Sequence, residues 1–231
     1  MKVALLSDIH ANVFALEAVL EDLRRENIDR ILVAGDLVGY YYWPKEVVGL
    51  LKGDSRVSCV RGNHEIILGE VLESPDAAIR YRNKYGSGYE VCRETLSADE
   101  LRWLVTLPES LTVDIDGCSF HVAHGSLSSV DEYLYPDAGA EELGRNYSNS
   151  TVTVFGHTHY PFLHARDERF LINPGSVGQP RDAGGMASYV IVNTENHTVR
   201  FRRKLFEQSK LVDASKSRDP ELKYLWTIMS R

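Results

Sequence analysis

The sequence predicts an α/β fold (α+β in some schemes), and two observations carry this prediction. The first 65 residues alternate short apolar runs with stretches of helical periodicity, in the order strand–helix–strand–helix–strand. After Pro108 the pattern changes to short strands separated by loops rich in Gly, Ser and Asn. Polar residues end the first three strands, and ligand sites in open α/β sheets lie outside the carboxyl ends of strands.

Three strands and two helices are expected in this first part of the chain. The strands cover residues 3–6, 30–34 and 56–60. Asn12 is a good N-cap for a helix whose apolar residues recur at helical spacing from Val13 to Leu23. A second, short helix should follow Pro44, because the fixed φ of proline suits a first helical turn.

The rest of the chain is expected to be mostly helical at first and then rich in strands. Residues 65–107 have a helical pattern, and the later strands are placed at residues 111–115, 119–123, 151–155, 170–172, 188–192 and 198–202. A C-terminal helix of about residues 219–230 should pack on the chain itself, since Leu222, Leu225, Trp226 and Met229 share one face. A homodimer contact is the alternative use of that face. Because no linker or repeat divides the chain, we expect one domain over residues 1–231.

The composition excludes several classes of protein. The chain has 231 residues, 43% of them hydrophobic and 26% charged, which is typical of a soluble globular protein. Its formal charge of −7 disfavours general nucleic-acid binding, which usually needs a basic excess. The longest uncharged stretch, residues 146–165, contains three histidines, so no membrane span is expected. The 3 cysteines form no CxxC pair, which favours a reducing, cytoplasmic compartment over a disulfide framework or a thiolate zinc site.

Five polar motifs stand at the ends of predicted strands. They are Asp8-Ile9-His10, Gly35-Asp36, Gly62-Asn63-His64-Glu65, His124-Gly125 and Gly156-His157-Thr158-His159. In Asp-x-His and His-x-His, two side chains point to the same side of an extended segment and can converge on one ion. A single such motif is more often a turn or core residue, but fold stability does not require five. Carboxylate, amide and imidazole ligands without a thiolate suit Mn, Fe, Zn or Ni.

This ordered set resembles that of the calcineurin-like metallophosphoesterases. The match runs from Asp8 to His159, and residues 172–181 are similar to the corresponding segment of small bacterial and archaeal members. The resemblance implies a four-layer α/β/β/α sandwich, in which two mixed sheets are flanked by helices. It also implies a site for two metal ions at one sheet edge.

The resemblance further implies a role for each motif residue. One ion would be held by Asp8, His10, Asp36 and His159, and the other by Asp36, Asn63, His124 and His157. Asp36 would then bridge the two ions, of which Mn²⁺ is favoured. His64 would face the substrate phosphate or the leaving group, and Glu65 would orient or polarise His64.

The expected activity is hydrolysis of small, nucleotide-like phosphodiesters or phosphomonoesters. Two divalent ions, Asp8, Asp36 and a metal-bridging hydroxide carry a net charge of about +1 with neutral imidazoles, which attracts a phosphate ester. Attack by that hydroxide needs no covalent phospho-enzyme. His64, if protonated, would donate to the departing alkoxide.

Departures from the family pattern leave the substrate open. Phosphoprotein phosphatases and related dinucleoside polyphosphate hydrolases carry a phosphate-binding Arg where this chain has Tyr40, so these activities are the alternative. Arg181 is a candidate replacement for that Arg, with a solvated loop residue as the competing interpretation. The other alternative is a binding scaffold such as the retromer subunit of this fold. The seven intact ligand positions argue against a scaffold.

Two aromatic clusters are candidates for the substrate pocket. Residues 40–43, Tyr-Tyr-Tyr-Trp, either stack on a nucleobase or pack as a loop against the neighbouring helix. Tyr81, Tyr85 and Tyr89 recur at helical spacing on one predicted helix, and we favour buried packing over recognition for them.

Overall fold

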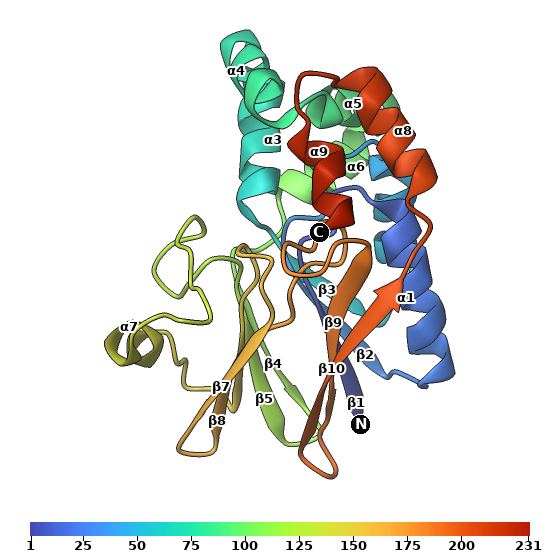
Figure 1. The fold of residues 1–231 in the computed structure, drawn as a ribbon. Coiled ribbons are helices and arrows are strands. Elements are labelled where there is room, and N and C mark those ends of the chain that lie inside the picture. Colours follow the sequence, from blue (N-terminus) through green and yellow to red (C-terminus); the bar gives the residue numbers. More distant parts are fainter.

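Two five-stranded sheets face each other in the computed structural model, which describes residues 1–231. Helices cover the outer face of one sheet, and a single short helix lies outside the other (Figure 1). This arrangement confirms the expected pair of mixed sheets flanked by helices.

The first sheet contains the first three and the last two strands of the chain, in the order β10-β9-β1-β2-β3. Its strands are β1 Lys2–Leu6, β2 Arg30–Ala34, β3 Val57–Val60, β9 Met186–Asn193 and β10 Thr198–Leu205. The first three are parallel and are connected by α1 Val13–Arg25 and α2 Pro44–Lys52, while β9 and β10 are antiparallel to their neighbours. As expected, the Asn12 side chain caps α1 by accepting a hydrogen bond from the backbone N–H of Ala15.

The second sheet has the order β4-β5-β6-β8-β7. Its strands are β4 Leu111–Ile115, β5 Cys118–Val122, β6 Val152–Val154, β7 Phe162–Arg166 and β8 Arg169–Asn173. The three central strands are parallel, and β4 and β7 are antiparallel edge strands. Helix α7, Ala140–Arg145, lies on its outer side (Figure 1).

Alternation along β1 shows how the two cores divide. Val3 and Leu5 belong to the core between the sheets, whereas Ala4 and Leu6 belong to the larger core under the helices. Side chains of a strand point alternately to its two faces, so both faces of this sheet must be apolar. Because β1 lies between the two cores, all four of its residues from Val3 to Leu6 are buried.

The helices of the middle and end of the chain gather beyond the carboxyl ends of β1, β2 and β3 (Figure 1). They are α3 Asn63–Glu73, α4 Pro75–Tyr85, α5 Gly88–Thr95, α6 Ala98–Val105, α8 Ser209–Arg218 and α9 Tyr224–Thr227, followed by a 3₁₀ turn over Ile228–Ser230. None of the helices combines the length and the apolar character that crossing a membrane requires.

Two expectations for these elements are corrected, and three elements are additional. The C-terminal helix of residues 219–230 is only α9 and the 3₁₀ turn, although Leu225 and Met229 are buried in the core of the same chain as expected. Tyr81 and Tyr89 lie on different helices, because Gly86 at φ +85° ends α4. The additional elements, for which the sequence shows no clear pattern, are β7, α7 and α8.

Candidate metal centre

The five motifs meet at one edge of the two sheets. Asp8 follows β1, Asp36 follows β2, and Asn63 begins α3 directly after β3. His124 follows β5, and the pair His157 and His159 follows β6. All seven expected metal ligands are buried. The topology therefore brings together residues that lie up to 151 positions apart in the chain.

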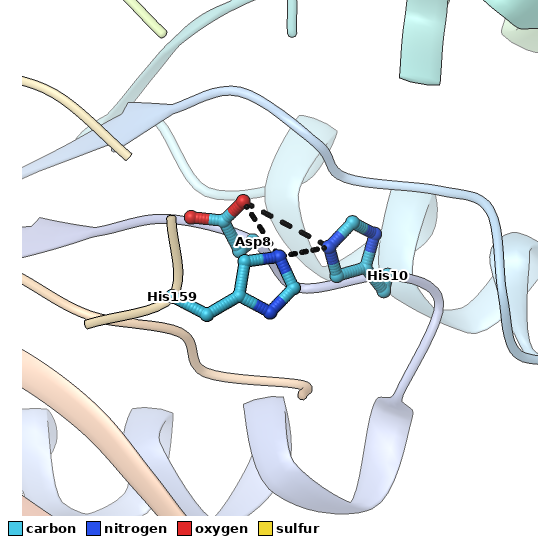
Figure 2. A group of neighbouring side chains, drawn as sticks. All are labelled: Asp8, His10 and His159. Carbon is cyan, nitrogen blue, oxygen red and sulfur yellow. Dashed lines mark hydrogen bonds and ion pairs between the residues drawn. The ribbon is translucent and has the colours of Figure 1, made fainter. Parts of the chain in front are cut away.

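One cluster is formed by Asp8, His10 and His159 (Figure 2). The Nε2 atoms of the two imidazoles are 3.1 Å apart. Asp8 Oδ1 lies 3.3 Å from Nε2 of His159 and 3.8 Å from Nε2 of His10. Three potential ligand atoms from two distant segments thus point at one position.

Asp36 connects this cluster to a second one. Asp36, His124 and His157 form a further group of converging ligand atoms, in which Asp36 Oδ2 lies 3.2 Å from His124 Nε2. The amide oxygen of Asn63 lies 3.0 Å from the same nitrogen. Asp36 Oδ2 is also 3.8 Å from Nε2 of His10, so one carboxylate reaches both groups.

Hydrogen bonds to the backbone fix the tautomers of three imidazoles. The Nδ1 atoms of His10, His124 and His159 lie 3.2, 2.6 and 2.6 Å from the carbonyl oxygens of residues 38, 34 and 179. A carbonyl oxygen only accepts, so each Nδ1 carries the hydrogen. In the neutral rings the Nε2 lone pairs are then directed into the clusters, which is the usual arrangement of a metal-binding histidine.

His157 supplies an independent test of whether a cation fits. Its Nε2 is buried and has no hydrogen-bond partner. An unpaired buried polar atom costs about 1–3 kcal/mol, so such atoms are rare unless a ligand satisfies them. Its backbone N–H is bonded to the carboxylate of Asp8 at 3.0 Å, which fixes the position of the residue between the two clusters. The donor set fits divalent ions.

The charges of the site agree with this conclusion. Burial opposes ionisation of Asp36, yet the neighbouring imidazoles of His124 and His64 hold its pKa well below the usual range. Burial lowers the pKa of His10, and it lowers that of His157 to about 4. The carboxylate is therefore charged and these imidazoles are neutral, which are the forms that bind metals.

His124 differs from the other imidazoles. Burial disfavours its charged form, but the carboxylates of Asp36 and Asp8 outweigh this and raise its pKa to about 10. The raised pKa reflects the excess of negative charge at this point, which a bound cation would neutralise in place of the proton.

The backbone at the site is strained. Asp8, His10, Asp36, His157 and His159 all have φ between +51° and +65°. Such conformations cost a residue other than glycine about 1–3 kcal/mol, and they persist where the surroundings impose them. Gly62 is part of those surroundings, because a Cβ there would overlap the carboxylate of Asp36.

The carboxylate of Glu65 makes no hydrogen bond to the ring of His64, so the structure does not show the direct orienting contact that was expected. Its two carboxylate oxygens accept four backbone hydrogen bonds of 2.8–3.2 Å, from residues 36, 37, 38 and 62. Burial raises its pKa to about 7, against the opposing effect of the N–H groups of Gly62 and Val38. Glu65 therefore holds the loop that positions Asp36.

Tyr89, for which the sequence favoured buried packing, is the residue that hydrogen-bonds to the ring of His64. Its hydroxyl lies 2.6 Å from Nδ1 of His64, and both side chains are buried. The His64 ring also lies 4.8 Å from the ring of His10 and 4.9 Å from that of Tyr85. Burial lowers the pKa of His64 to about 4, so the ring is neutral at neutral pH.

The aromatic residues 40–43 are mainly structural. The Tyr41 hydroxyl donates to the carbonyl of Leu225 at 3.1 Å, and that of Tyr42 donates to Asp219 at 2.8 Å. These two side chains are buried and cannot stack on a ligand. Tyr40 is also buried, and its ring packs 4.6 Å from His10 and 4.7 Å from His64.

Arg181 lies near this edge of the site. Burial raises the pKa of Tyr40, and the charge of Arg181 is the main opposing influence. The structure gives its guanidinium no hydrogen bond or ion pair, and the side chain is only half-buried. Its role in substrate binding stays a prediction.

Tyr133 is a residue that the sequence analysis did not place at the site. Its ring lies 4.0 Å from that of His157, and 46% of the residue is exposed. No periodicity or motif surrounds residue 133, so its position could be known only from the folded chain.

Comparisons with known proteins agree with this geometry. A sequence model of the calcineurin-like phosphoesterase superfamily domain matches residues 1–197. An uncharacterised protein of Methanocaldococcus jannaschii is 34% identical over 95% of this chain and 94% of its own length. The phosphodiesterase YfcE of Escherichia coli is 26% identical over 84% of this chain and 89% of its own length. The crystal structure of a metallophosphoesterase from Sphaerobacter thermophilus superposes with a TM-score of 0.81 at 30% identity and covers 100% of this chain and 99% of its own.

Proposed function

The chain belongs to the calcineurin-like phosphoesterase superfamily, a family of phosphoric ester hydrolases. From this premise we propose that it uses two divalent ions to hydrolyse small, nucleotide-like phosphodiesters or phosphomonoesters. The observation that carries the proposal is the carboxylate of Asp36, which reaches imidazole nitrogens of two separate ligand clusters. We further propose that the protein acts in the cytoplasm, in keeping with its free and buried cysteines.

The residues present divide into two ligand sets. One ion would be held by Asp8, His10, Asp36 and His159, and the other by Asp36, Asn63, His124 and His157. We propose Mn²⁺ for both positions, since the set offers carboxylate, amide and imidazole ligands. Divalent ions in such a site polarise a phosphate ester and bring the pKa of a water molecule from about 15.7 toward 7.

The chain's own residues then orient the substrate and stabilise its leaving group. His64 has no protein partner on its Nε2, and Tyr89 occupies its Nδ1. When the Tyr89 hydroxyl donates to Nδ1, the neutral ring carries its hydrogen on Nε2 and can donate a hydrogen bond from it to the leaving-group oxygen, which stabilises the charge that develops there without transfer of the Nε2 proton. A cationic His64 is therefore not required, and the low pKa of the ring does not conflict with this role.

The test is hydrolysis by the purified protein after chelation and reloading with Mn²⁺. Bis(p-nitrophenyl) phosphate, p-nitrophenyl phosphate and a dinucleoside tetraphosphate serve as diester, monoester and polyphosphate substrates. We expect hydrolysis to depend on added metal, to be fastest with a diester or monoester, and to disappear in Asp36→Asn. Loss of both activity and metal in this variant supports the shared carboxylate.

Two results would contradict the proposal. A metal-loaded protein that hydrolyses none of the three substrates would indicate a binding scaffold. Hydrolysis of the dinucleoside tetraphosphate alone would support the alternative activity that Tyr40 disfavours.

A further inference from the structure

A cavity of about 320 Å³ opens beside the candidate metal centre. Asn63, one of the expected ligands, lines it together with residues of α3, α4 and the loop before α7. A molecule in this cavity would therefore be adjacent to a substrate phosphate at the metal ions.

Two pairs of nearly parallel tyrosine rings belong to this region. Tyr81 and Tyr85 of α4 line the cavity, with ring centres 6.1 Å apart and ring planes 13° apart. Tyr133 lines it from the loop before α7, and its ring is within 10° of parallel to that of Tyr135. Tyr133 also contacts the ring of His157 at 4.0 Å, so the aromatic surface extends up to the metal ligands.

The exposure of Tyr133 and Tyr135 distinguishes them from core residues. They are 46% and 40% exposed, whereas Tyr41 and Tyr89 of the same chain are buried. Core packing does not explain the exposure of Tyr133 in the cavity wall or of Tyr135 just outside it. Aromatic side chains of this kind bind the faces of nucleobases.

Unpaired charges complete the region. The Lys84 ammonium lines the cavity and lies 4.8 Å from the centre of the Tyr85 ring, whereas Arg181 lies outside the cavity lining and acts on Tyr133 only through its charge. Neither cation takes part in an ion pair. Both charges lie close enough to Tyr133 to oppose the rise that burial causes in its pKa. Because Glu70 and Asp131 also line the cavity, its wall carries charges of both signs, and the tyrosines are the feature that favours a planar ligand.

We propose that this cavity, lined by Tyr81, Lys84, Tyr85 and Tyr133 beside Asn63, binds the base of a nucleotide whose phosphate lies at the metal centre. The inference rests on the proposed function and names the substrate class for it: phosphate esters that carry a nucleoside. Stacking selects the base by its flat faces, so purines and pyrimidines are both accepted. An acyl chain does not suit the cavity, because Glu70 and Asp131 also line it.

The experiment compares two phosphates that differ only in the base. Inhibition constants for AMP, ribose 5-phosphate and inorganic phosphate are measured from initial rates of bis(p-nitrophenyl) phosphate hydrolysis by the Mn²⁺-loaded protein. We expect AMP to bind about tenfold more tightly than ribose 5-phosphate, because stacking a base on an aromatic side chain has roughly this effect. In Tyr133→Leu the ratio of the two constants should fall toward one, and in Tyr133→Phe it should be retained.

Phe201 provides the matched control. It is 42% exposed on β10 and lies outside the cavity, so Phe201→Leu should leave the ratio unchanged. Saturation-transfer NMR on the protein reloaded with diamagnetic Zn²⁺ in place of Mn²⁺ reports whether the adenine protons of AMP contact the protein, and this readout needs no hydrolysis.

The outcomes separate the two proposals. Hydrolysis with equal constants for AMP and ribose 5-phosphate, or an unchanged ratio in Tyr133→Leu, would overturn the base subsite and leave the phosphoesterase intact. Absence of hydrolysis would contradict the proposed function, and absence of saturation transfer to adenine would then also overturn the subsite.

Discussion

Two neighbours fix the orientation of His64. The Tyr89 hydroxyl is bonded to Nδ1 from one side. Gly39, at φ +86°, allows the loop after β2 to pass directly against the ring, where a Cβ would overlap Nδ1. The proposed function of His64 thus depends on Tyr89 and Gly39, which only position its ring.

Tyr89→Phe tests this arrangement. It removes the hydroxyl and keeps the ring, so we expect a loss in kcat of about 10- to 100-fold for esters with poor leaving groups, since one hydrogen-bond donor to a developing negative charge contributes roughly 10²–10³-fold and Tyr89 only positions it. Nitrophenyl esters, whose leaving-group oxygen needs little stabilisation, should be affected much less. The measurement is kcat against leaving-group pKa, and an equal loss across the series would contradict the positioning role.

Tyr147→Phe is the matched control. Tyr147 makes the same kind of hydrogen bond to Nδ1 of His164, outside the candidate site. Removing its hydroxyl should leave the leaving-group dependence unchanged. A similar change in both variants would show that the effect is one of stability.

Single residues also show the limits of prediction from sequence. The motif that contains Glu65 marks it as important, but only the folded chain shows that its carboxylate accepts bonds from residues 36, 37, 38 and 62. Motif spacing reports residue types that belong together. Motif spacing does not show which buried backbone N–H groups need a hydrogen-bond partner. The contacts of Glu65 are decided by four such groups.

At the scale of elements, Asp219 joins the end of the chain to α5 and to the loop after β2. Its buried carboxylate accepts bonds from the Ser87 backbone N–H at 3.0 Å, the Ser87 hydroxyl at 2.9 Å and the Tyr42 hydroxyl at 2.8 Å. The C-terminal segment packs beside the site through these bonds.

Asp219→Ala should destabilise the protein by about 2–3 kcal/mol, because it leaves buried donors unsatisfied. Urea unfolding measures the change. Asp213→Ala, on the exposed side of α8, is the control and should alter the free energy of unfolding by less than about 0.5 kcal/mol. Equal effects of the two variants would contradict the role of Asp219.

A second connection joins α1 to β9 and β10 through Asp22. The Tyr189 hydroxyl donates to its carboxylate, and Arg202 donates to it at 3.1 Å. The hydrogen bond from Tyr189, followed by the charge of Arg202, holds the pKa of Asp22 below its usual value. The stabilisation is therefore present above the unfolded pKa of about 3.9 and is lost as pH falls through the lower, folded value.

Asp22→Asn should accordingly cost about 1–2 kcal/mol at pH 7, and the difference from wild type should shrink as pH falls below about 4. Urea unfolding at several pH values measures it. Glu21→Gln, which alters an exposed pair with Arg25 on the same helix, should change stability by less than about 1 kcal/mol. A difference between Asp22→Asn and wild type that stays constant down to pH 2 would contradict the linkage.

The elements that could be predicted are those with strong burial patterns. The strands β1 and β2 are continuous apolar runs, and α1 has both a capping residue and a regular apolar stripe. By contrast, β7 is an edge strand with no buried residue, and α8 buries only Leu211 and Ser215. Their sequences carry little periodicity because few of their side chains face a core.

The topology of the whole molecule is the reason why the metal ligands could be predicted better than the residues around them. Parallel strands of two sheets end at one edge, so motifs placed after β1, β2, β3, β5 and β6 converge there (Figure 1). Each motif is local in sequence and could be identified without coordinates. Tyr89 and Tyr133 reach the site through helix packing and a loop path, which leave no local pattern.

The proposed function depends above all on Asp36 being shared between two bound divalent ions. The most direct measurement is anomalous diffraction from crystals grown with Mn²⁺, together with the metal content of the same protein. We expect two Mn²⁺ peaks, one beside Asp8, His10 and His159 and the other beside Asn63, His124 and His157, with the Asp36 carboxylate between them. A single peak, or an Asp36 carboxylate that contacts neither ion, would contradict it.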